Sequence, residues 1–314
     1  MLLKDYLEEW LAGYGESRLK PSTAFGYRKK INSYVLPALG EYELSSLTPY
    51  LIQNWVYDLH QHGRSRGRGP LNPKTVIQAY RILSRSLKSA CRLGLLAQNP
   101  CSGVELPRRK RYDYCWLTDT EAILSFLAAF RDFPYYPAVV LAMFGGLRRS
   151  EVLGLRYDDF DFSRASVLIC RSVVQDSARR VVLGDLKNDT SFRSVLLPAF
   201  VMDMVAGMER NSPYLFPASD GGLLHPETFS KCYQVYRDKH GLPKIRFHDL
   251  RHSHASLLFS SGIEPRIIQD RLGHSNIKTT LDIYTHTDVN LQMPLVRLLD
   301  EMFATRINGK SPPL

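Results

Sequence analysis

Along residues 2–94, apolar residues recur every three or four positions, a spacing typical of amphipathic helices. Val76 and Leu83, for example, fall on one face of the segment 72–94. Thr48 and Asn72 are each followed by a proline, which places a capping side chain before a proline in the first helical turn. The pattern predicts four helices, at 2–13, at 22–36 with Ser22 at its start, at 48–63 and at 72–94.

From Leu117 onward, helical and strand-like patterns are mixed. Thr118, with Glu121 three residues later, has the spacing of a capping box and predicts a helix start. Further helices are expected at 137–144 and from Arg149, Phe200, Thr228, Phe247 and Pro265, and strands at 166–174, 179–183 and 193–197. Helices before and after a small antiparallel sheet indicate an α+β domain.

Between these two parts the periodicity stops. Residues 98–115 mix prolines and a glycine with the basic run 108–111, as expected of a linker. The predicted organisation is a helical domain at 1–97, a basic interdomain linker at 98–115, an α+β domain at 116–289 and a terminal amphipathic helix within 290–314.

The positive charge of the chain is concentrated at its start. The formal net charge is +10, and residues 1–110 carry 17 Lys and Arg against 8 Asp and Glu, so the remainder is close to neutral. Lys and Arg gathered in one domain are typical of nucleic-acid binding, because they neutralise phosphates. A merely solvated basic surface would explain the sign of the charge but not its concentration, so we expect a nucleic-acid partner.

Composition argues against membrane and disulfide-rich classes. No apolar run is long enough to span a bilayer, and the N-terminus carries acidic residues where a signal peptide would be apolar. The five cysteines are odd in number and include no CxxC pair, which indicates reduced thiols. We therefore expect a soluble protein of the cytoplasm.

The segment HDLRHSHAS (248–256) brings three histidines and an arginine together. On a helix, His248 and His252 have the spacing of two zinc ligands, but no third ligand pattern accompanies them, and Arg251 would repel a dication. Simple packing is the ordinary alternative for His252 and for His254. A guanidinium and an imidazole at a helix N-terminus suit a phosphate better, so we expect His248 and Arg251 to act on phosphate.

Three further motifs accompany HDLR in a recognisable order. GLRRSE places Arg148, LKND places Lys187, and the segment from LGHSN to DIYTH places His274 and Tyr284. The four ordered motifs, over residues 117–290, resemble the tyrosine recombinase family, which includes the integrases of phages and conjugative transposons.

The resemblance implies a two-domain fold. An all-α core-binding domain of the SAM-like four-helix type would come first, and KPSTAFGY (20–27) and NPKTV (72–76) stand where that domain is expected to carry them. A mainly helical α+β catalytic domain with a small antiparallel sheet would follow.

The resemblance also implies an activity, which is site-specific recombination through a 3′-phosphotyrosine intermediate, without metal or ATP. We therefore expect no cofactor and no bound metal. The implied catalytic residues are Arg148, Lys187, His248, Arg251, His274 and Tyr284.

Each of these six residues has a role in the implied chemistry. Tyr284 would be the nucleophile, and the two arginines would stabilise the negative charge of the transition state. His274 would hydrogen-bond the phosphate, His248 would accept the phenolic proton, and Lys187 would protonate the leaving 5′ oxygen. Each residue alone could be a packing or turn residue, but their ordered occurrence favours catalysis.

Other charged residues near these motifs have separate expectations. Glu151 is expected to orient Arg148 from the same helical turn, and His252 is expected to support the site without touching DNA. Three arginines stay open between DNA contact and a structural role, and these are Arg149, Arg193 and Arg271.

Double-stranded DNA at recombination core sites is the expected partner. The expected DNA-contacting residues are Arg64, Arg66, Arg68, Lys74, Arg81, Arg85, Lys88, Arg108, Arg109, Lys110 and Arg111. The resemblance implies a homotetramer on synapsed DNA, with the terminal helix of residues 290–314 exchanged between subunits, and association with the bacterial nucleoid. For the free protein, docking of that helix within its own chain is the open alternative. An accessory DNA-bending or directionality factor is a further candidate partner.

Two other functions stay open at this point. A DNA-binding regulator could keep the fold without cleaving, although the complete set of six residues argues against it. A topoisomerase-like enzyme could share the tyrosine chemistry without exchanging strands, although the motif spacing and the separate helical domain favour the integrase type.

Overall fold

A computed structural model describes residues 1–15, 18–19, 21–63, 69–108, 116–117, 119–176, 180–184, 186 and 189–274. The chain divides into two compact units, one built on residues 1–113 and the other on residues 114–174 and 181–314. None of the helices in these described ranges is long and apolar enough to cross a membrane. The four cysteines among the described residues, Cys91, Cys101, Cys170 and Cys232, are free thiols.

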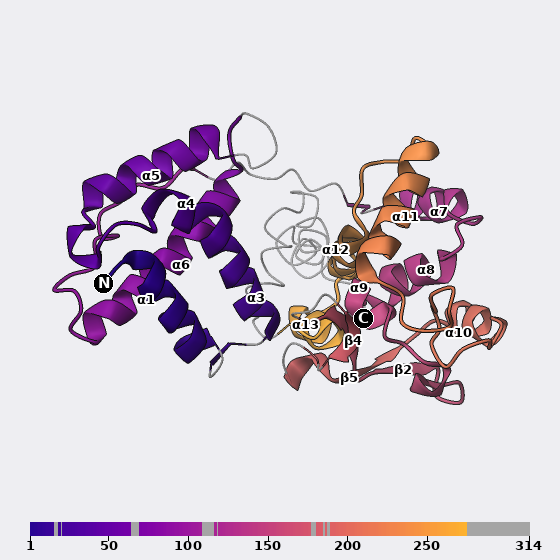
Figure 1. The fold of residues 1–314 in the computed structure, drawn as a ribbon. Helices are drawn as coiled ribbons and strands as arrows, with labels where there is room; N and C mark the ends of the chain where they lie inside the picture. Colours follow the sequence, from indigo (N-terminus) through magenta and orange to yellow (C-terminus); the bar gives the residue numbers. More distant parts are fainter. Residues whose placement is uncertain are drawn as a thin grey trace, which may run out of the picture. The chain divides into compact units, whose positions relative to one another are not determined.

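The first unit is helical (Figure 1). Its elements are α1 (Leu3–Trp10), the π-helical turn η1 (Leu11–Gly15), α3 (Pro21–Lys30), the π-helical turn η2 (Ile31–Val35), α4 (Leu36–Leu39), the 3₁₀ turn η3 (Leu44–Ser46), α5 (Pro49–His62) and α6 (Pro73–Arg92). The long α6 buries one face against the core of this unit. The predicted all-α character of this part is confirmed.

Two helix starts follow the predicted caps. The Thr48 side chain accepts a hydrogen bond from the backbone N–H of Leu51, and Asn72 accepts one from Lys74. The predicted start at Ser22 is one residue late, because α3 begins at Pro21.

The first two predicted helices are not continuous α-helices. η1 follows α1, and η2 separates α3 from α4. A π-turn widens the helix by one residue per turn, and at η2 the carbonyl of Tyr34 accepts the indole N–H of Trp55 at 2.9 Å. A hydrophobic pattern of helical period does not reveal where such a turn occurs.

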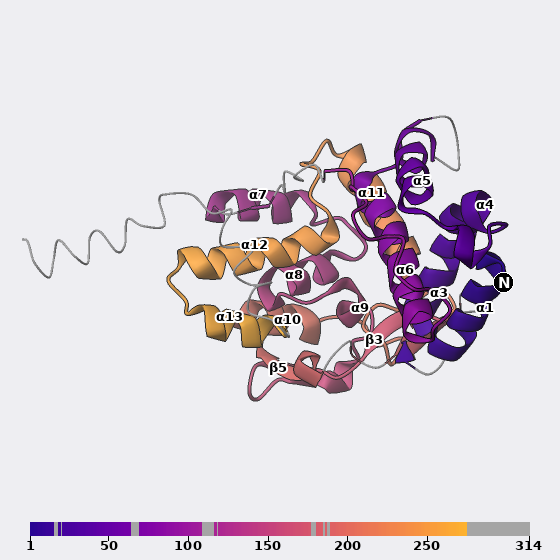
Figure 2. The ribbon, with the colours of Figure 1, turned by 90° about the vertical axis from the view of Figure 1, so that its left-hand side faces the viewer.

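The second unit combines helices with short strands (Figures 1 and 2). Its elements are α7 (Thr120–Ala129), α8 (Tyr136–Gly145), α9 (Arg149–Val152), the 3₁₀ turn η4 (Tyr157–Asp159), β1 (Phe160–Asp161), β2 (Ser166–Ile169), β3 (Ser172–Gln175), β4 (Val181–Gly184), the 3₁₀ turn η5 (Asp189–Ser191), β5 (Arg193–Leu196), α10 (Ala199–Ala206), α11 (Pro226–Lys239), α12 (Phe247–Ser260) and α13 (Pro265–Leu272). The predicted α+β class is confirmed.

The described strands form two small sheets. β1, β2 and β5 form a three-stranded antiparallel sheet, and β3 pairs with β4. The strand predicted over 166–174 is therefore wrong as one element, because it breaks between β2 and β3 at Arg171, whose guanidinium turns to Asp159 at 2.5 Å. β1 has only two residues and was not predicted. The cap predicted at Thr118 is also wrong, because α7 begins at Thr120 and Asp119 accepts the N–H of Ala122.

Helix α8 lies at the centre of this unit. Its side chains from Ala138 to Met143 are all buried, α12 lies along it, and α13 returns beside α12 (Figure 2). On the sheet, β5 alternates so that Arg193 and Val195 point inward while Leu196 is exposed. A charged side chain thus occupies a position on the core face.

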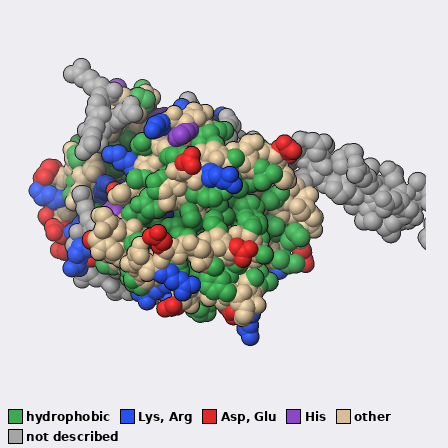
Figure 3. All heavy atoms as spheres, turned by 90° about the vertical axis from the view of Figure 1, so that its right-hand side faces the viewer, with side chains coloured by type: hydrophobic (Ala, Val, Ile, Leu, Met, Phe, Trp, Pro, Cys, Tyr) green, Lys and Arg blue, Asp and Glu red, His purple; other side chains and the backbone are tan. Residues whose placement is uncertain are grey.

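One face of the second unit is largely apolar. Figure 3 shows hydrophobic side chains gathered across it, with few charges among them. The large apolar side chains that this unit exposes include Leu124, Leu196, Phe200 and Val235. Contiguous apolar surface of this kind is typical of protein interfaces.

Gly146 and Gly273 are helix C-caps in the left-handed conformation. Gly146, with φ +65°, caps the C-terminus of α8, and Gly273, with φ +65°, caps α13. A Cβ at Gly146 would lie 2.6 Å from Cδ2 of His254 and 2.7 Å from a methyl carbon of Leu272. The close approach of α12 and α13 to this turn therefore needs a residue without a side chain.

We expect Gly146→Ala to destabilise the second unit much more than Gly241→Ala. Gly241 has a similar φ, +63°, but a Cβ there meets nothing within 4 Å, so it serves as a matched control for the left-handed conformation alone. That conformation costs about 1 kcal/mol for alanine, and overpacking at Gly146 adds about 1–3 kcal/mol. Urea denaturation followed by circular dichroism measures the difference, and equal losses would contradict it.

Candidate active site

Arg148 stands where α8 turns into α9. It is the N-cap of α9, and its backbone N–H donates to Oε2 of Glu151 at 2.8 Å while its Nη1 donates to Oε1 at 2.5 Å. Glu151 is only 2% exposed. The predicted contact by which Glu151 orients Arg148 from the same helical turn is therefore present.

Helix α12 carries His248 and Arg251. Its start is fixed by Asp249, which accepts the backbone N–H of Arg246 at 2.9 Å and the guanidinium of the same residue at 2.6 and 2.8 Å. Arg251 lies three residues after His248 on the first turns and is 2% exposed. Its Nη1 donates to the carbonyl of Gly146 at 2.6 Å.

The same two arginines bind the end of α13. Nη2 of Arg251 donates to the carbonyl of Leu272 at 2.5 Å, and Nη2 of Arg148 donates to the carbonyl of Gly273 at 2.7 Å. Carbonyls at a helix C-terminus carry partial negative charge, so guanidiniums are favourable partners there. These bonds bring His274, the residue after Gly273, to the arginines.

The site carries a large excess of positive charge. Burial lowers the pKa of Arg251 well below its ordinary value, and the charge of Arg148 lowers it further. Burial by itself would raise the pKa of Glu151, but the charge and hydrogen bonds of Arg193 and the charge of Arg148 hold it below its ordinary value. An anion such as a phosphodiester would relieve the repulsion among these arginines.

The histidines of the site are neutral at pH 7. Burial, with the charges of Arg251 and Arg148, lowers the pKa of His274 to about 3 and that of His248 to about 4. Besides burial, the neighbouring His252 and the charge of Arg251 contribute to the lowered pKa of His248. A neutral imidazole is the form that accepts a proton.

The other two histidines of HDLRHSHAS pack inside the unit. His254 is 4% exposed and its Nε2 accepts a hydrogen bond from Nε of Arg271 at 3.0 Å, as the packing interpretation predicted. The ring of His252 lies 5.1 Å from that of His248 and 5.9 Å from that of Trp116. Among the described residues, no group of three His, Cys, Asp or Glu side chains is arranged to hold a metal.

Four of the six predicted catalytic residues thus come together, from the start of α9, from α12 and from the end of α13. They are Arg148, His248, Arg251 and His274. Lys187 and Tyr284 lie outside the described residues.

Two further arginines belong to this cluster. Arg193 donates to both carboxylate oxygens of Glu151, at 3.3 and 3.0 Å, and Arg271 donates to the carbonyl of Phe144 at 2.8 Å. The sequence left both undecided between DNA contact and structure. For Arg193 the sequence did carry a signal, because it shares the buried side of the segment with Val195 and Leu197, at every second position.

A separate basic surface lies on the first unit. Lys74, Arg81, Arg85, Lys88 and Arg92 of α6 are all exposed, and their spacing places them within about 60° of one another around the helix axis, over about 27 Å. We call these five residues the basic stripe.

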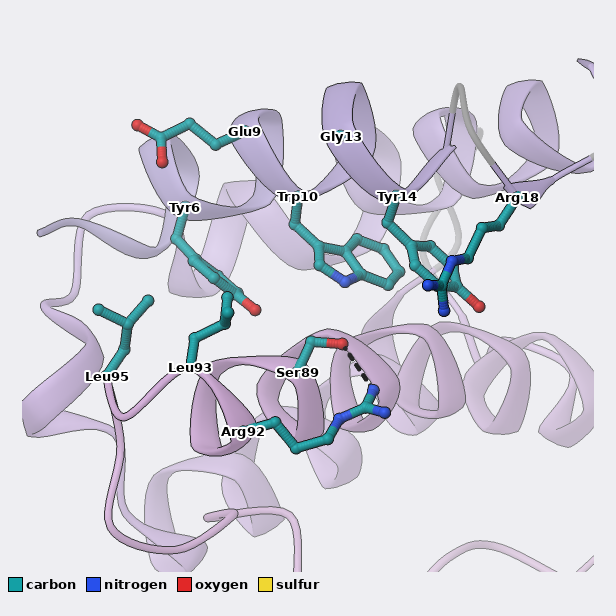
Figure 4. A pocket seen from close by; sticks show the side chains of 10 residues that line it. All are labelled: Tyr6, Glu9, Trp10, Gly13, Tyr14, Arg18, Ser89, Arg92, Leu93 and Leu95. Carbon is teal, nitrogen blue, oxygen red and sulfur yellow. Dashed lines mark hydrogen bonds between the residues drawn. The ribbon is translucent and has the colours of Figure 1, made fainter.

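Aromatic side chains lie beside the middle of the basic stripe. The guanidinium carbon of Arg85 lies 5.2 Å from the ring centre of Tyr14, which stacks on Trp10 at 5.0 Å. Arg92, with Arg18, borders a pocket beside these rings (Figure 4). Of the other predicted DNA contacts, Arg108 is exposed, and those outside the described residues are Arg64, Arg66, Arg68, Arg109, Lys110 and Arg111.

The lowered pKa values predict that acid destabilises the second unit. His254 has a pKa of about 3 when folded against about 6.5 when unfolded. Below about pH 6.5 the imidazole of His254 binds a proton in the unfolded chain but stays neutral in the folded chain. The free energy of unfolding therefore falls as the pH falls toward 3. Each such histidine contributes up to about 1.4 kcal/mol per pH unit. In urea titrations between about pH 5 and pH 7, His254→Gln is expected to show a shallower loss, and a wild-type slope in this variant would contradict the prediction.

Sequence profiles of known families match most of the chain. The sequence profile described as "Phage integrase family" matches residues 117–290, and that of "Phage integrase, N-terminal SAM-like domain" matches residues 2–60. A tyrosine recombinase XerC-like protein of Caldanaerobacter subterraneus subsp. tengcongensis is 25% identical over 96% of this chain and 83% of its own. The integrase of Mycobacterium phage L5 is 27% identical over 87% of this chain and 72% of its own.

Solved structures share the fold. The Tn1549 transposon integrase superposes with a TM-score of 0.81 at 19% identity, covering 95% of this chain and 99% of that one. A lambda integrase of residues 75–356 gives a TM-score of 0.68 at 17% identity, covering 89% and 97%. With more than half of the sequence matched by the family profile, the chain belongs to the phage integrase family of tyrosine recombinases.

Proposed function

We propose that this protein is a site-specific DNA recombinase that breaks and rejoins DNA through a 3′-phosphotyrosine at Tyr284. The observation that carries the proposal is that Arg148 and Arg251 both donate hydrogen bonds to carbonyls at the end of α13, and that Arg251 also donates to the carbonyl at the end of α8. These bonds bring the two arginines beside His248 and His274. Such a cluster binds a phosphodiester and stabilises the additional negative charge of its transition state.

The proposed cleavage step assigns one task to each group. The phenolic oxygen of Tyr284 attacks phosphorus, and the bond from phosphorus to the 5′ oxygen breaks. Neutral His248 accepts the phenolic proton. A base is needed because a free phenol, with a pKa of about 10, is a weak nucleophile at neutral pH. Lys187 gives a proton to the leaving oxygen.

Rejoining uses the energy of the first step. The phosphotyrosine bond replaces the phosphodiester bond, so a 5′-hydroxyl of another strand can reverse the reaction without ATP. The two arginines supply the positive charge at phosphorus, and a metal ion is not required for that task.

The basic stripe on α6 is proposed to lie against the DNA backbone. Five exposed cations along about 27 Å of one helix face match a run of phosphates. The Tn1549 integrase was solved with circular intermediate DNA and a lambda integrase dimer with a core site, and the fold shared with them supports DNA as the partner.

Assembly on DNA is proposed to produce a homotetramer. A lambda integrase tetramer was solved on a Holliday junction, and the apolar face of the second unit (Figure 3) suits a contact between subunits. The segment 290–314, proposed to pass between subunits, lies outside the described residues.

We expect Tyr284→Phe to abolish covalent attachment to DNA while leaving DNA binding intact. A pool of nicked random duplexes is incubated with protein in EDTA, and covalent complexes are separated on a denaturing gel. Tyr50→Phe is the control, because Tyr50 is 76% exposed on α5 and its hydroxyl has no role in the proposed chemistry.

Each outcome decides between functions. A covalent band with Tyr284→Phe would reject Tyr284 as the nucleophile. Binding by the wild type without any covalent band would favour a regulator of the same fold. A band accompanied only by relaxation of supercoiled DNA, without strand exchange, would favour the topoisomerase-like alternative.

We expect Arg81→Gln with Lys88→Gln to reduce the salt dependence of DNA binding. These two members of the basic stripe are exposed, and removing one cation from a phosphate lowers the slope of log K against log salt by about 0.9. The slope of the double variant should therefore be smaller by about 1.8. Arg164→Gln, at a side chain 83% exposed in the second unit, is the control, and an equal effect there would reject the stripe.

A further inference from the structure

Glu151 is a buried carboxylate with two arginine partners. Oε1 accepts from Nη1 of Arg148 at 2.5 Å and from Nη1 of Arg193 at 3.3 Å. Oε2 accepts from the backbone N–H of Arg148 at 2.8 Å and from Nη2 of Arg193 at 3.0 Å. Glu151 is 2% exposed and Arg193 9% exposed, so water screens this group weakly.

Arg193 is turned toward protein groups. Besides Glu151, it donates through Nε to the carbonyl of Arg271 at 2.7 Å and through Nη1 to the carbonyl of Ser191 at 3.0 Å. Arg148 differs, because its side chain is 24% exposed. Arg148 can therefore reach a ligand, whereas Arg193 serves the interior.

Two other acids in this unit show what one arginine can do. Asp159 accepts the backbone N–H of Arg156 at 2.7 Å and is paired with Arg171, and Asp249 is paired with Arg246. In both, a buried carboxylate three residues after an arginine caps the start of a helix or 3₁₀ turn, and among the described residues it is paired with a single guanidinium. Capping therefore does not require the second guanidinium that Glu151 has.

The second guanidinium changes the charge that Arg148 presents. Arg148 and Glu151 alone form a neutral pair, and a weakly screened carboxylate would cancel much of the attraction between Arg148 and a phosphate. With Arg193 the three side chains carry a net charge of +1. Glu151 can then fix the direction of Arg148 without cancelling its charge.

We propose that Arg193 is a positioning residue for DNA cleavage, which offsets the charge of Glu151 so that Arg148 stays an effective cation toward the scissile phosphate. This inference rests on the proposed recombinase function. Because negative charge on the nonbridging oxygens grows as Tyr284 attacks, Arg193 acts mainly on the rate of cleavage and little on DNA affinity.

A charge-rescue experiment tests the proposal. Wild type, Arg193→Met, Glu151→Gln and the double variant are compared in single-turnover cleavage on a suicide duplex recovered from the wild-type covalent pool. Arg193→Met should slow cleavage by about 100-fold, as loss of a transition-state donor does, while DNA affinity changes by less than about 3-fold. Adding Glu151→Gln should restore about 10-fold, since it removes the charge that Arg193 offset.

A second substrate separates electrostatics from disturbed folding. In a duplex with a neutral methylphosphonate at the scissile position, Arg193→Met should lose much less rate relative to wild type, because less charge develops there. Arg193→Lys keeps the charge without the fork and should fall between wild type and Arg193→Met. Arg171→Met, which leaves the buried carboxylate of Asp159 without its guanidinium, should lower thermal stability without slowing cleavage by folded protein.

The outcomes are distinguishable. If the double variant is no faster than Arg193→Met, or if the methylphosphonate deficit equals the phosphate deficit, Arg193 has a structural role only and the proposal fails. If Arg193→Met does not fold, the same test applies to Arg193→Lys with and without Glu151→Gln. If wild type forms no covalent complex at all, the proposed function fails first, and that failure appears before any variant is compared.

Discussion

The bonds from Arg251 to two backbone carbonyls hold the candidate site together. Gly146 ends the segment that leads to Arg148, and Leu272 ends the helix that leads to His274. Hydrogen bonds from a charged donor contribute about 1.5–3 kcal/mol each, and a buried carbonyl left without a donor costs about 1–3 kcal/mol. Arg251 therefore fixes both chain turns at once, and a glycine at each turn allows the close approach that this geometry needs.

Gathering guanidiniums in a buried site has an energetic cost. Three arginines, Arg148, Arg193 and Arg251, surround Glu151, the carboxylate that pairs with the first two of them. Their mutual repulsion, with burial, lowers the pKa of Arg251 and keeps the nearby histidines neutral. This arrangement favours the binding of an anion, because the negative charge of a phosphate would offset the repulsion among the arginines. The net positive charge of the site depends on whether the negative charge of Glu151 is offset by a second arginine.

The motifs predicted which residues lie together at the candidate site better than periodicity predicted the boundaries of helices and strands. His248 and Arg251 were placed together because they lie three residues apart on one helix. Helix starts at Thr48 and Asn72 followed from local capping. By contrast, the π-turns after α1 and α3, the break at Arg171 and the cap at Asp119 depend on contacts with residues distant in sequence or on single hydrogen bonds. A hydrophobic pattern does not contain that information.

The sequence by itself determined the class of this protein: a basic helical domain, an α+β domain and four ordered motifs that resemble those of the tyrosine recombinase family. These features follow from local spacing and composition, which each segment carries without its neighbours. Only the tertiary structure decided the partners of Arg193, because Glu151 lies 42 residues earlier and meets it at the inward face of β5. It also decided that buried His254 accepts a hydrogen bond from Arg271. Burial and charge compensation arise when distant segments meet, and a residue's own neighbours in sequence do not fix them.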